Sequence, residues 1–316
     1  MFWDAFLLII GLSALTVGAE GLVRGSASLS IRMGLTPLII GLTVVAFGTS
    51  TPELVVSLIA SLNNQPDIAI GNVVGSNIFN VGIILGLTAL ICPVKTNLQI
   101  IKHDAPIMIA ASLLSVFLIV KGALTALTGT GLFIMLIAYI IYSIRLAQKA
   151  VFADIEKQFM EGVPARSQSL FRDLLFIGAG LLFLVTGSHL LVISATNIAR
   201  SLGISEAVIG LTVIAAGTSM PELATSVVAA LRRQPDIAVG NVIGSNIFNI
   251  LGILGLSSIA NPLSATGITA FDLWTMVGLS IALLPLMYTN LKLQRWEGLS
   301  LLLVYGAYLW TLWPSS

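Results

Sequence analysis

Long apolar runs alternate with short polar breaks along the whole chain. The breaks concentrate Pro, Gly, Asn and charged residues, as in Asn63–Pro66, Cys92–Lys95 and Arg232–Pro235. They divide the chain into ten runs, and about 20 apolar residues are enough to cross a bilayer as a helix. The pattern therefore predicts an all-α polytopic membrane protein with ten transmembrane helices.

Composition and charge support this class. The chain is 57% hydrophobic and 9% charged, whereas soluble domains carry charge on about a quarter of their residues. The single cysteine, Cys92, excludes a disulfide framework and a four-thiolate metal site. The first run, 5–23, lacks the basic segment and the cleavage site of a signal peptide, so we expect it to be a retained span.

Basic residues lie almost entirely on one set of alternate connections. The other set contains only Lys121 and Arg200. Because cytoplasmic loops carry the excess of Lys and Arg, we expect a multi-pass protein of the cell membrane with both termini outside the cytoplasm. The segment 148–169 is then a cytoplasmic linker, too short to form a regulatory domain.

The chain contains an internal repeat at an offset of 169 residues. Of the 40 positions in Gly41–Asn80, 28 are identical in Gly210–Asn249, without a gap. Each copy contains five predicted spans. Because five is an odd number, the second copy enters the membrane from the opposite side and has the inverted orientation. We therefore expect two inverted five-helix repeats, 1–147 with its core repeat at 36–93, and 170–316 with its core repeat at 205–262. Such repeats place substrate sites at their interface, near the middle of the membrane.

Glu53 and Glu222 are equivalent residues of the two copies, and each lies inside an apolar span. A charged carboxylate at that depth costs at least about 2.5–3.5 kcal/mol. One explanation is a carboxylate that is protonated or paired with a structural Arg or Lys. However, Gly41–Asn80 contains no basic residue. Two mirrored glutamates without a basic partner favour a cation site with up to two negative charges.

The residues around each glutamate can supply further oxygen ligands. Thr49, Glu53 and Ser57 share one helix face, and the second copy repeats this row. Pro52 precedes Glu53 and removes a helical hydrogen bond, which frees carbonyl groups of the preceding turn. An ordinary kink is the alternative, because Pro is common in membrane helices. Carboxylate, hydroxyl and carbonyl oxygens together suit Ca²⁺, which takes 6–8 of them.

The following span carries a second polar row in each copy. From this row we predict four further ligands: Ser76, Asn80, Ser245 and Asn249. Asn72 and Asn241 lie nearer the helix ends, where ligation and hydrogen bonding to the backbone both remain open. Asn77 and Asn246 lie off the row, which favours hydrogen bonds between helices.

Other residues in these segments have structural interpretations. We expect Asp67 and Asp236 to be helix N-caps, and Glu20 to pair with Arg24 four residues later. Two pairs of glycines are expected to allow close helix packing: Gly71 with Gly75, and Gly240 with Gly244.

The motifs GTSTPE with GNVVGSNIFN, and GTSMPE with GNVIGSNIFN, resemble the repeats of the calcium/cation antiporter superfamily. Within it, the chain is similar to the prokaryotic sodium/calcium exchangers. The resemblance implies exchange of Ca²⁺ for Na⁺ by alternating access. It also implies a ligand set formed by Glu53, Glu222, Thr49, Ser50, Thr218, Ser219, Ser76, Asn80, Ser245, Asn249 and the backbone carbonyls of Ala46 and Ala215.

Two positions of this chain differ from relatives in the superfamily. Asn80 and Asn249 are both amides, whereas potassium-dependent relatives have an Asp in this row, which argues against K⁺ co-transport. Some potassium-independent relatives also keep an Asp at the position of Asn249. The formal charge of the site is therefore expected to rest on Glu53 and Glu222 alone.

Three other functions compete with Na⁺-coupled exchange. A Ca²⁺/H⁺ antiporter is the nearest alternative, because both glutamates can carry protons. A passive cation channel belongs to another class, and the inverted repeat argues against it. An enzyme is disfavoured because no catalytic motif is present. We expect Ca²⁺ and Na⁺ as transported ions, the lipid bilayer as surroundings, neither cofactor nor nucleic acid, and transport by a monomer.

Overall fold

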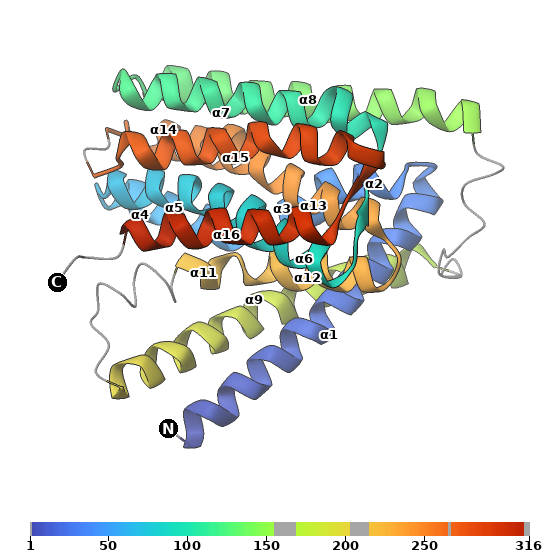
Figure 1. The fold of residues 1–316 in the computed structure, drawn as a ribbon, viewed down its shortest axis with the longest axis horizontal. Helices are drawn as coiled ribbons and strands as arrows, with labels where there is room; N and C mark the ends of the chain where they lie inside the picture. Colours follow the sequence, from blue (N-terminus) through green and yellow to red (C-terminus); the bar gives the residue numbers. More distant parts are fainter. Residues whose placement is uncertain (1, 155–168, 203–214, 265–266, 313–316) are drawn as a thin grey trace.

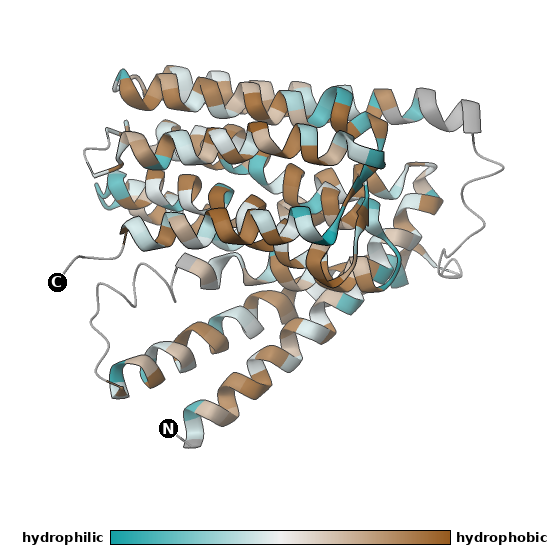
Figure 2. Cartoon of the chain, in the orientation of Figure 1, coloured by the Kyte–Doolittle hydropathy of each residue, from teal (hydrophilic) through white to brown (hydrophobic). Residues whose placement is uncertain are grey.

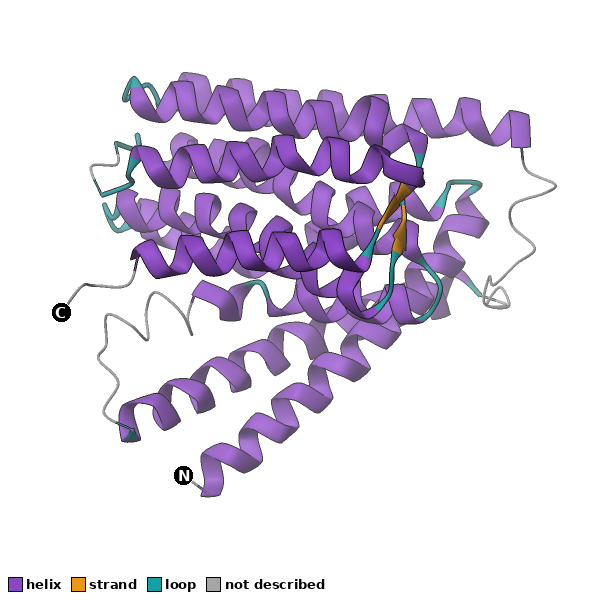
Figure 3. Ribbon diagram, viewed as in Figure 1, coloured by secondary structure: helices purple, strands orange, loops and turns teal. Residues whose placement is uncertain are grey.

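Helices make up nearly all of the described chain, as the apolar pattern predicts (Figures 1 and 3). The computed structural model describes residues 2–154, 169–202, 215–264 and 267–312. The elements before the central connection are α1 (Phe2–Met33), α2 (Pro37–Ile40), η1 (Gly41–Val45), α3 (Ala46–Thr49), α4 (Thr51–Leu62), α5 (Pro66–Phe79), η2 (Asn80–Leu85), α6 (Gly86–Ile91), β1 (Val94–Lys95), η3 (Ile100–Asp104), α7 (Ala105–Val120) and α8 (Ala126–Asp154). Those after it are α9 (Leu170–Ser201), α11 (Ala215–Thr218), α12 (Met220–Leu231), α13 (Pro235–Ile247), η5 (Phe248–Ile253), α14 (Leu254–Ala260), α15 (Ala270–Tyr288), η6 (Thr289–Leu291), β2 (Lys292–Leu293) and α16 (Arg295–Leu312).

Seven helical stretches in the described residues are long and apolar enough to cross a membrane. The number rises to eight if the bent pair Pro37–Thr49 and Thr51–Leu62 is one span. The short apolar helix α12 follows α11, and residues 203–214 before α11 lie outside the described ranges. α16 begins with the charged residues Arg295 and Glu297. The structure thus shows a helical, multi-span protein, with hydrophobic residues along its helices and hydrophilic ones mainly at the connections (Figure 2).

Two long helices, α1 and α9, pack side by side at an angle to the other helices (Figure 1). Their contact depends on glycines that bring the backbones together. A side chain at Gly18 would meet the carbonyl oxygen of Gly180 at 2.7 Å, and one at Gly187 would meet that of Gly11 at 2.8 Å. Without a hydrophobic driving force between helices in lipid, such close packing is a main source of association.

The central helices of the molecule carry the polar rows predicted from the sequence. The stretch Pro235–Ala260 is buried throughout its most apolar window, and Pro66–Ile91 is mostly buried. Both stretches change from α- to π-helix in the middle, at η2 and η5, which begin at Asn80 and Phe248. These π-segments, which often occur at functional sites, were not predicted from the sequence.

Contacts between distant helices enclose this centre. Gly129 of α8 lies against Gly255 of α14, and Gly86 of α6 lies against Gly298 of α16. The short strands β1 and β2 pair antiparallel, with Val94 opposite Leu293 (Figure 3). Each of these contacts joins a segment before the central connection to one after it.

The predicted N-caps are wrong. Asp67 and Asp236 lie in the first turns of α5 and α13, and the capping residues are Gln65 and Gln234. The physical reason is proline, which occupies the first helical position and forces the residue before it out of the helix. Asp67 Oδ1 instead accepts a hydrogen bond from the Gly267 amide at 2.8 Å.

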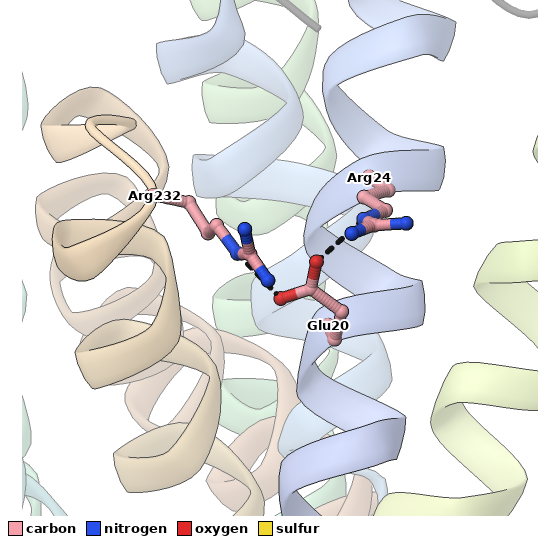
Figure 4. A network of polar contacts seen from close by, with 3 residues as sticks. All are labelled: Glu20, Arg24 and Arg232. Atoms are coloured by element: carbon pink, nitrogen blue, oxygen red, sulfur yellow. Dashed lines mark hydrogen bonds and ion pairs between the residues drawn. The ribbon is translucent and has the colours of Figure 1, made fainter.

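The expected ion pair between Glu20 and Arg24 is confirmed, and it has a third member. Arg232, at the end of α12, contacts the other carboxylate oxygen of Glu20 with its Nε at 2.7 Å (Figure 4). The sequence assigned Arg232 to a loop and gave it no partner. Glu20 therefore connects α1 to a helix of the other half of the chain.

Two expected segments extend into residues outside the described ranges. α8 continues to Asp154, past the expected start of the linker, and the rest of that linker up to residue 168 is not described. The expected core repeat 205–262 likewise begins among undescribed residues. The boundaries of the two repeats therefore stay predictions.

The glycine pairs expected to allow close packing differ between the two copies. A side chain at Gly240 would meet the Leu38 carbonyl oxygen at 2.9 Å, and one at Gly244 would meet that of Leu42 at 2.5 Å. A side chain at Gly75 would have no described atom within 4 Å. The expectation is therefore confirmed for the second pair, and Gly75 makes no such contact with the described part of the chain.

Candidate ion-binding site

Each predicted glutamate follows a break between two helices. The breaks lie at Ser50, with φ −82° and ψ 8°, and at Ser219, with φ −88° and ψ 7°. At Ser50 the axis bends by 48°, three residues before Glu53. Glu53 and Glu222 thus lie in the first turns of α4 and α12, where the positive end of the helix dipole favours a carboxylate.

Each glutamate accepts a hydrogen bond from a serine of the opposite copy. Ser50 Oγ donates to Glu222 Oε1 at 2.7 Å, and Ser219 Oγ donates to Glu53 Oε1 at 2.9 Å. Both carboxylates are 1% exposed. Each helix break therefore fixes the carboxylate of the other copy. The sequence missed this crossing, because it shows only that each serine stands three residues before its own glutamate.

Several buried oxygen atoms around this pair have no hydrogen-bond partner among the described residues. They are Glu53 Oε2, Glu222 Oε2, Asn80 Oδ1, Asn249 Oδ1 and Ser245 Oγ. A buried acceptor without a donor costs roughly 1–3 kcal/mol. Carboxylate, amide and hydroxyl oxygens of this kind are ligands for hard cations.

The carboxylates have no basic partner in the part of the chain that the structure describes. The described ion pairs of Arg and Lys join Arg24 and Arg232 to Glu20, and Arg32 to Asp173. This disfavours the interpretation of Glu53 and Glu222 as structural ion-pair residues. It leaves two buried carboxylates surrounded by neutral oxygen atoms.

Asn72 and Asn241 brace the glutamate helices. Asn72 Nδ2 donates to the Glu53 carbonyl at 3.1 Å and to Ser57 Oγ at 2.9 Å. Asn241 Nδ2 makes the same two contacts in the second copy, to the Glu222 carbonyl at 3.2 Å and to Ser226 Oγ at 3.0 Å. Of the two roles left open by the sequence, the structure shows the hydrogen bond to the backbone.

The remaining predicted residues occupy the same region with different partners. Thr49 Oγ1 donates to Asn241 Oδ1 at 3.0 Å, and the Ala46 carbonyl accepts the Ser50 amide at 3.0 Å. Ser76 Oγ lies 3.4 Å from Ser219 Oγ. Ala215 and Thr218 begin and end α11, directly before the break at Ser219.

The expected interhelical role of Asn77 and Asn246 is confirmed. Asn77 Nδ2 donates to the Asn246 carbonyl at 3.3 Å, and each side chain accepts a hydrogen bond from an asparagine of the opposite copy. The contacts join α5 and η2 to α13 and η5 at the centre of the molecule.

Comparison with known proteins agrees with this geometry. The profile of the sodium/calcium exchanger protein family matches residues 3–145 and 173–313, which is most of the chain. The chain belongs to this family. The match includes both glutamates and all the asparagines of the two polar rows.

Several relatives of this sodium/calcium exchanger family member match along nearly their whole length. It is 35% identical to the inner membrane protein YrbG of Escherichia coli, over 96% of this chain and 94% of that protein. It is also 35% identical to the sodium/calcium exchanger MaX1 of Methanosarcina acetivorans, over 96% of both chains. A structure of the sodium-calcium exchanger NCX_Mj, soaked with 2.5 mM Na⁺ and 0.1 mM Ca²⁺, matches with a TM-score of 0.84 and 31% identity over 99% of both chains.

Proposed function

We propose that this protein exchanges Ca²⁺ for Na⁺ across the membrane by alternating access. The observation that supports this most directly is a set of oxygen atoms around two buried glutamates that have neither a hydrogen-bond partner nor a basic residue beside them in the described ranges. Two negative charges match one Ca²⁺ or two Na⁺ ions. Membership of the sodium/calcium exchanger family and the similarity to exchangers of that name support the same ions.

The proposed architecture is ten spans in two inverted five-span repeats. The bent pair α2–α4, the broken helix ending in α12, and α16 supply the spans beyond the seven continuous ones. Support comes from contacts that recur in both copies, such as Asn72 with Ser57 and Asn241 with Ser226. The excess of basic residues on alternate connections supports termini outside the cytoplasm and a cytoplasmic connection after α8.

Coupling follows from the charge of the site. An empty site with two ionised glutamates faces a high cost in crossing the low-dielectric barrier between the two access states. Ca²⁺, or Na⁺ ions, remove most of that charge, so the loaded protein changes state more easily than the empty one. The protein therefore exchanges Ca²⁺ for Na⁺ and does not carry a net flow of either ion alone.

The proposed ligands are the residues predicted from the sequence. Glu53 and Glu222 contribute the charge. In each, Oε1 accepts a hydrogen bond from a serine, and Oε2 has no hydrogen-bond partner among the residues that the structure describes. Neutral oxygens come from Thr49, Ser50, Thr218, Ser219, Ser76, Asn80, Ser245, Asn249 and the carbonyls of Ala46 and Ala215.

The test is ⁴⁵Ca²⁺ uptake into proteoliposomes loaded in turn with Na⁺, K⁺, Li⁺ or choline. We expect uptake that requires an outward Na⁺ gradient and stops when the gradient is collapsed. Vesicles containing a double variant, Glu53→Gln with Glu222→Gln, measure the leak. Uptake driven by a pH gradient alone would identify a Ca²⁺/H⁺ antiporter, and uptake without any counter-ion would identify a channel.

A further inference from the structure

Four buried asparagines form a cluster between the two copies, next to the candidate site. Asn80 Nδ2 donates to Asn246 Oδ1 at 2.9 Å, and Asn249 Nδ2 donates to Asn77 Oδ1 at 2.9 Å. None of the four is more than 2% exposed. We call them the asparagine clasp.

The clasp determines which end of each ligand amide faces the site. An asparagine side chain has an acceptor oxygen and a donor NH₂ group that differ little in shape. In Asn80 and Asn249 the NH₂ group donates a hydrogen bond, and the oxygen has no partner in the part of the chain that the structure describes. If either amide turned over, a donor would replace the oxygen and would repel a cation.

Contacts on their other side hold Asn77 and Asn246 in place. Asn77 Nδ2 donates to the Asn246 carbonyl at 3.3 Å and lies 3.9 Å from Met276 Sδ. Asn246 Nδ2 lies 3.6 Å from Met108 Sδ. Because the NH₂ groups of Asn77 and Asn246 point toward these contacts, their side-chain oxygens face the NH₂ groups of Asn249 and Asn80, respectively.

The segments that carry Asn80 and Asn249 pack against the glutamate helices. η2, which begins at Asn80, packs against α12, the helix of Glu222. η5, which contains Asn249, packs against α4, the helix of Glu53. Both asparagines therefore belong to segments that contact the glutamate helix of the opposite copy.

We propose that Asn77 and Asn246 are positioning residues that hold the carbonyl oxygens of Asn249 and Asn80 toward the transported cation. They do not touch the ion themselves. The proposal rests on the proposed function, because it takes Asn80 and Asn249 as ligands.

The first test compares two substitutions of Asn246. Asn246→Leu keeps the approximate size but removes the acceptor for Asn80. We expect the KM for Ca²⁺ to rise about tenfold, which is the effect of losing one favourable polar contact, while kcat changes much less. Asn246→Asp keeps an oxygen opposite Asn80 Nδ2 and should keep the KM near or below that of the wild type. Equal damage from both substitutions would overturn the proposal.

A double-mutant cycle separates positioning from general packing. If Asn246 acts through Asn80, Asn246→Leu should raise the KM little further in an Asn80→Ala background. Asn77→Leu in that background should still raise it, because Asn77 acts on Asn249. Full additivity of Asn246→Leu and Asn80→Ala would mean that Asn246 acts by another route.

A binding measurement in detergent separates failure of this proposal from failure of the proposed function. Ca²⁺ that binds the folded protein raises its Tm. Absence of this shift in the wild type would contradict the Ca²⁺ site itself. A normal shift in both the wild type and Asn246→Leu would contradict only the clasp. If clasp positioning supports binding, Asn246→Leu should show a smaller Tm shift than the wild type at the same Ca²⁺ concentration. Should Asn246→Leu not yield folded protein, Asn246→Ala takes its place in both tests, with the same expected rise in KM and the same smaller shift.

Discussion

Glu20 on α1 and Arg232 at the end of α12 are joined across the two halves of the chain by a 2.7 Å contact between Oε2 and Nε (Figure 4). A second pair, Arg32 with Asp173, joins α1 to α9 at 2.8 Å. The two pairs have the same chemistry and differ in burial. The Arg232 and Glu20 side chains are 55% and 23% exposed, whereas those of Arg32 and Asp173 are 20% and 0% exposed.

Burial predicts different effects of removing the two arginines. Arg32→Gln removes a hydrogen bond to the fully buried Asp173 carboxylate, and we expect a loss of about 1.5–3 kcal/mol in the free energy of unfolding. Arg232→Gln removes an exposed contact, and we expect a loss of about 0.2–1 kcal/mol. Unfolding in mixed micelles measures both. Similar losses from the two variants would contradict the distinction.

Removing the charge of either site glutamate should stop transport. We expect Glu53→Gln and Glu222→Gln each to abolish Na⁺-driven ⁴⁵Ca²⁺ uptake, because the remaining charge is too small to bind Ca²⁺ in a buried site. The variants should remain folded, which gel filtration and thermal unfolding check. Glu20→Gln, an acid outside the site, is the matched control and should retain uptake. Full activity in either site variant would exclude the proposed site.

The crossed serines should control affinity from the opposite copy. Ser50→Ala removes the donor to Glu222, and Ser219→Ala removes the donor to Glu53. A hydrogen bond to a charged group contributes about 1.5–3 kcal/mol, so we expect the KM for Ca²⁺ to change by about tenfold or more in each variant. Ser30→Ala, whose hydroxyl donates to the Ala27 carbonyl of its own helix, is the control. An unchanged KM in both site variants would show that these hydrogen bonds do not support the bound state.

Two glycines of α8 provide a matched test of packing. Ala at position 129 would bring its Cβ to 2.5 Å from the Gly255 carbonyl oxygen, whereas the exposed Gly131 has no described atom within 4 Å. We expect Gly129→Ala to destabilise the protein by about 1–3 kcal/mol, as overpacking does. Gly131→Ala should be neutral or stabilising by up to about 1 kcal/mol, because alanine is the better helix former. Thermal unfolding in detergent compares them, and equal Tm values would contradict the close contact.

The site was predictable where its signal is local in the sequence. Glu53 and Glu222 are conspicuous because their neighbours are apolar, and Pro52 marks the bend because it lacks an amide donor. The roles of Asn77 and Asn246 followed from their position off the polar row. The internal repeat strengthened each of these predictions, because the same residue types recur 169 positions later in the chain.

The features of the site that the sequence did not predict depend on packing between segments that are far apart in the chain. The hydrogen bonds from Ser50 to Glu222 and from Ser219 to Glu53 require each helix break to lie beside the glutamate of the other copy, which no local spacing reveals. The π-segments at Asn80 and Phe248 have the same apolar composition as the α-helices around them. The N-cap prediction for Asp67 failed because Pro66 takes the first helical position.

The glycine contacts between the halves also have a consequence for biogenesis. Three close backbone contacts join glycines of the two halves: Gly18 with Gly180, Gly86 with Gly298, and Gly129 with Gly255. Helices of the first half therefore lack these packing partners until the second half is synthesised. At about 5–20 residues per second, the ribosome takes on the order of ten seconds to supply the partner of α1. The nascent first half therefore enters the bilayer with its closest-packing faces still against lipid. The close packing of the two halves is therefore completed only after the second half has been synthesised.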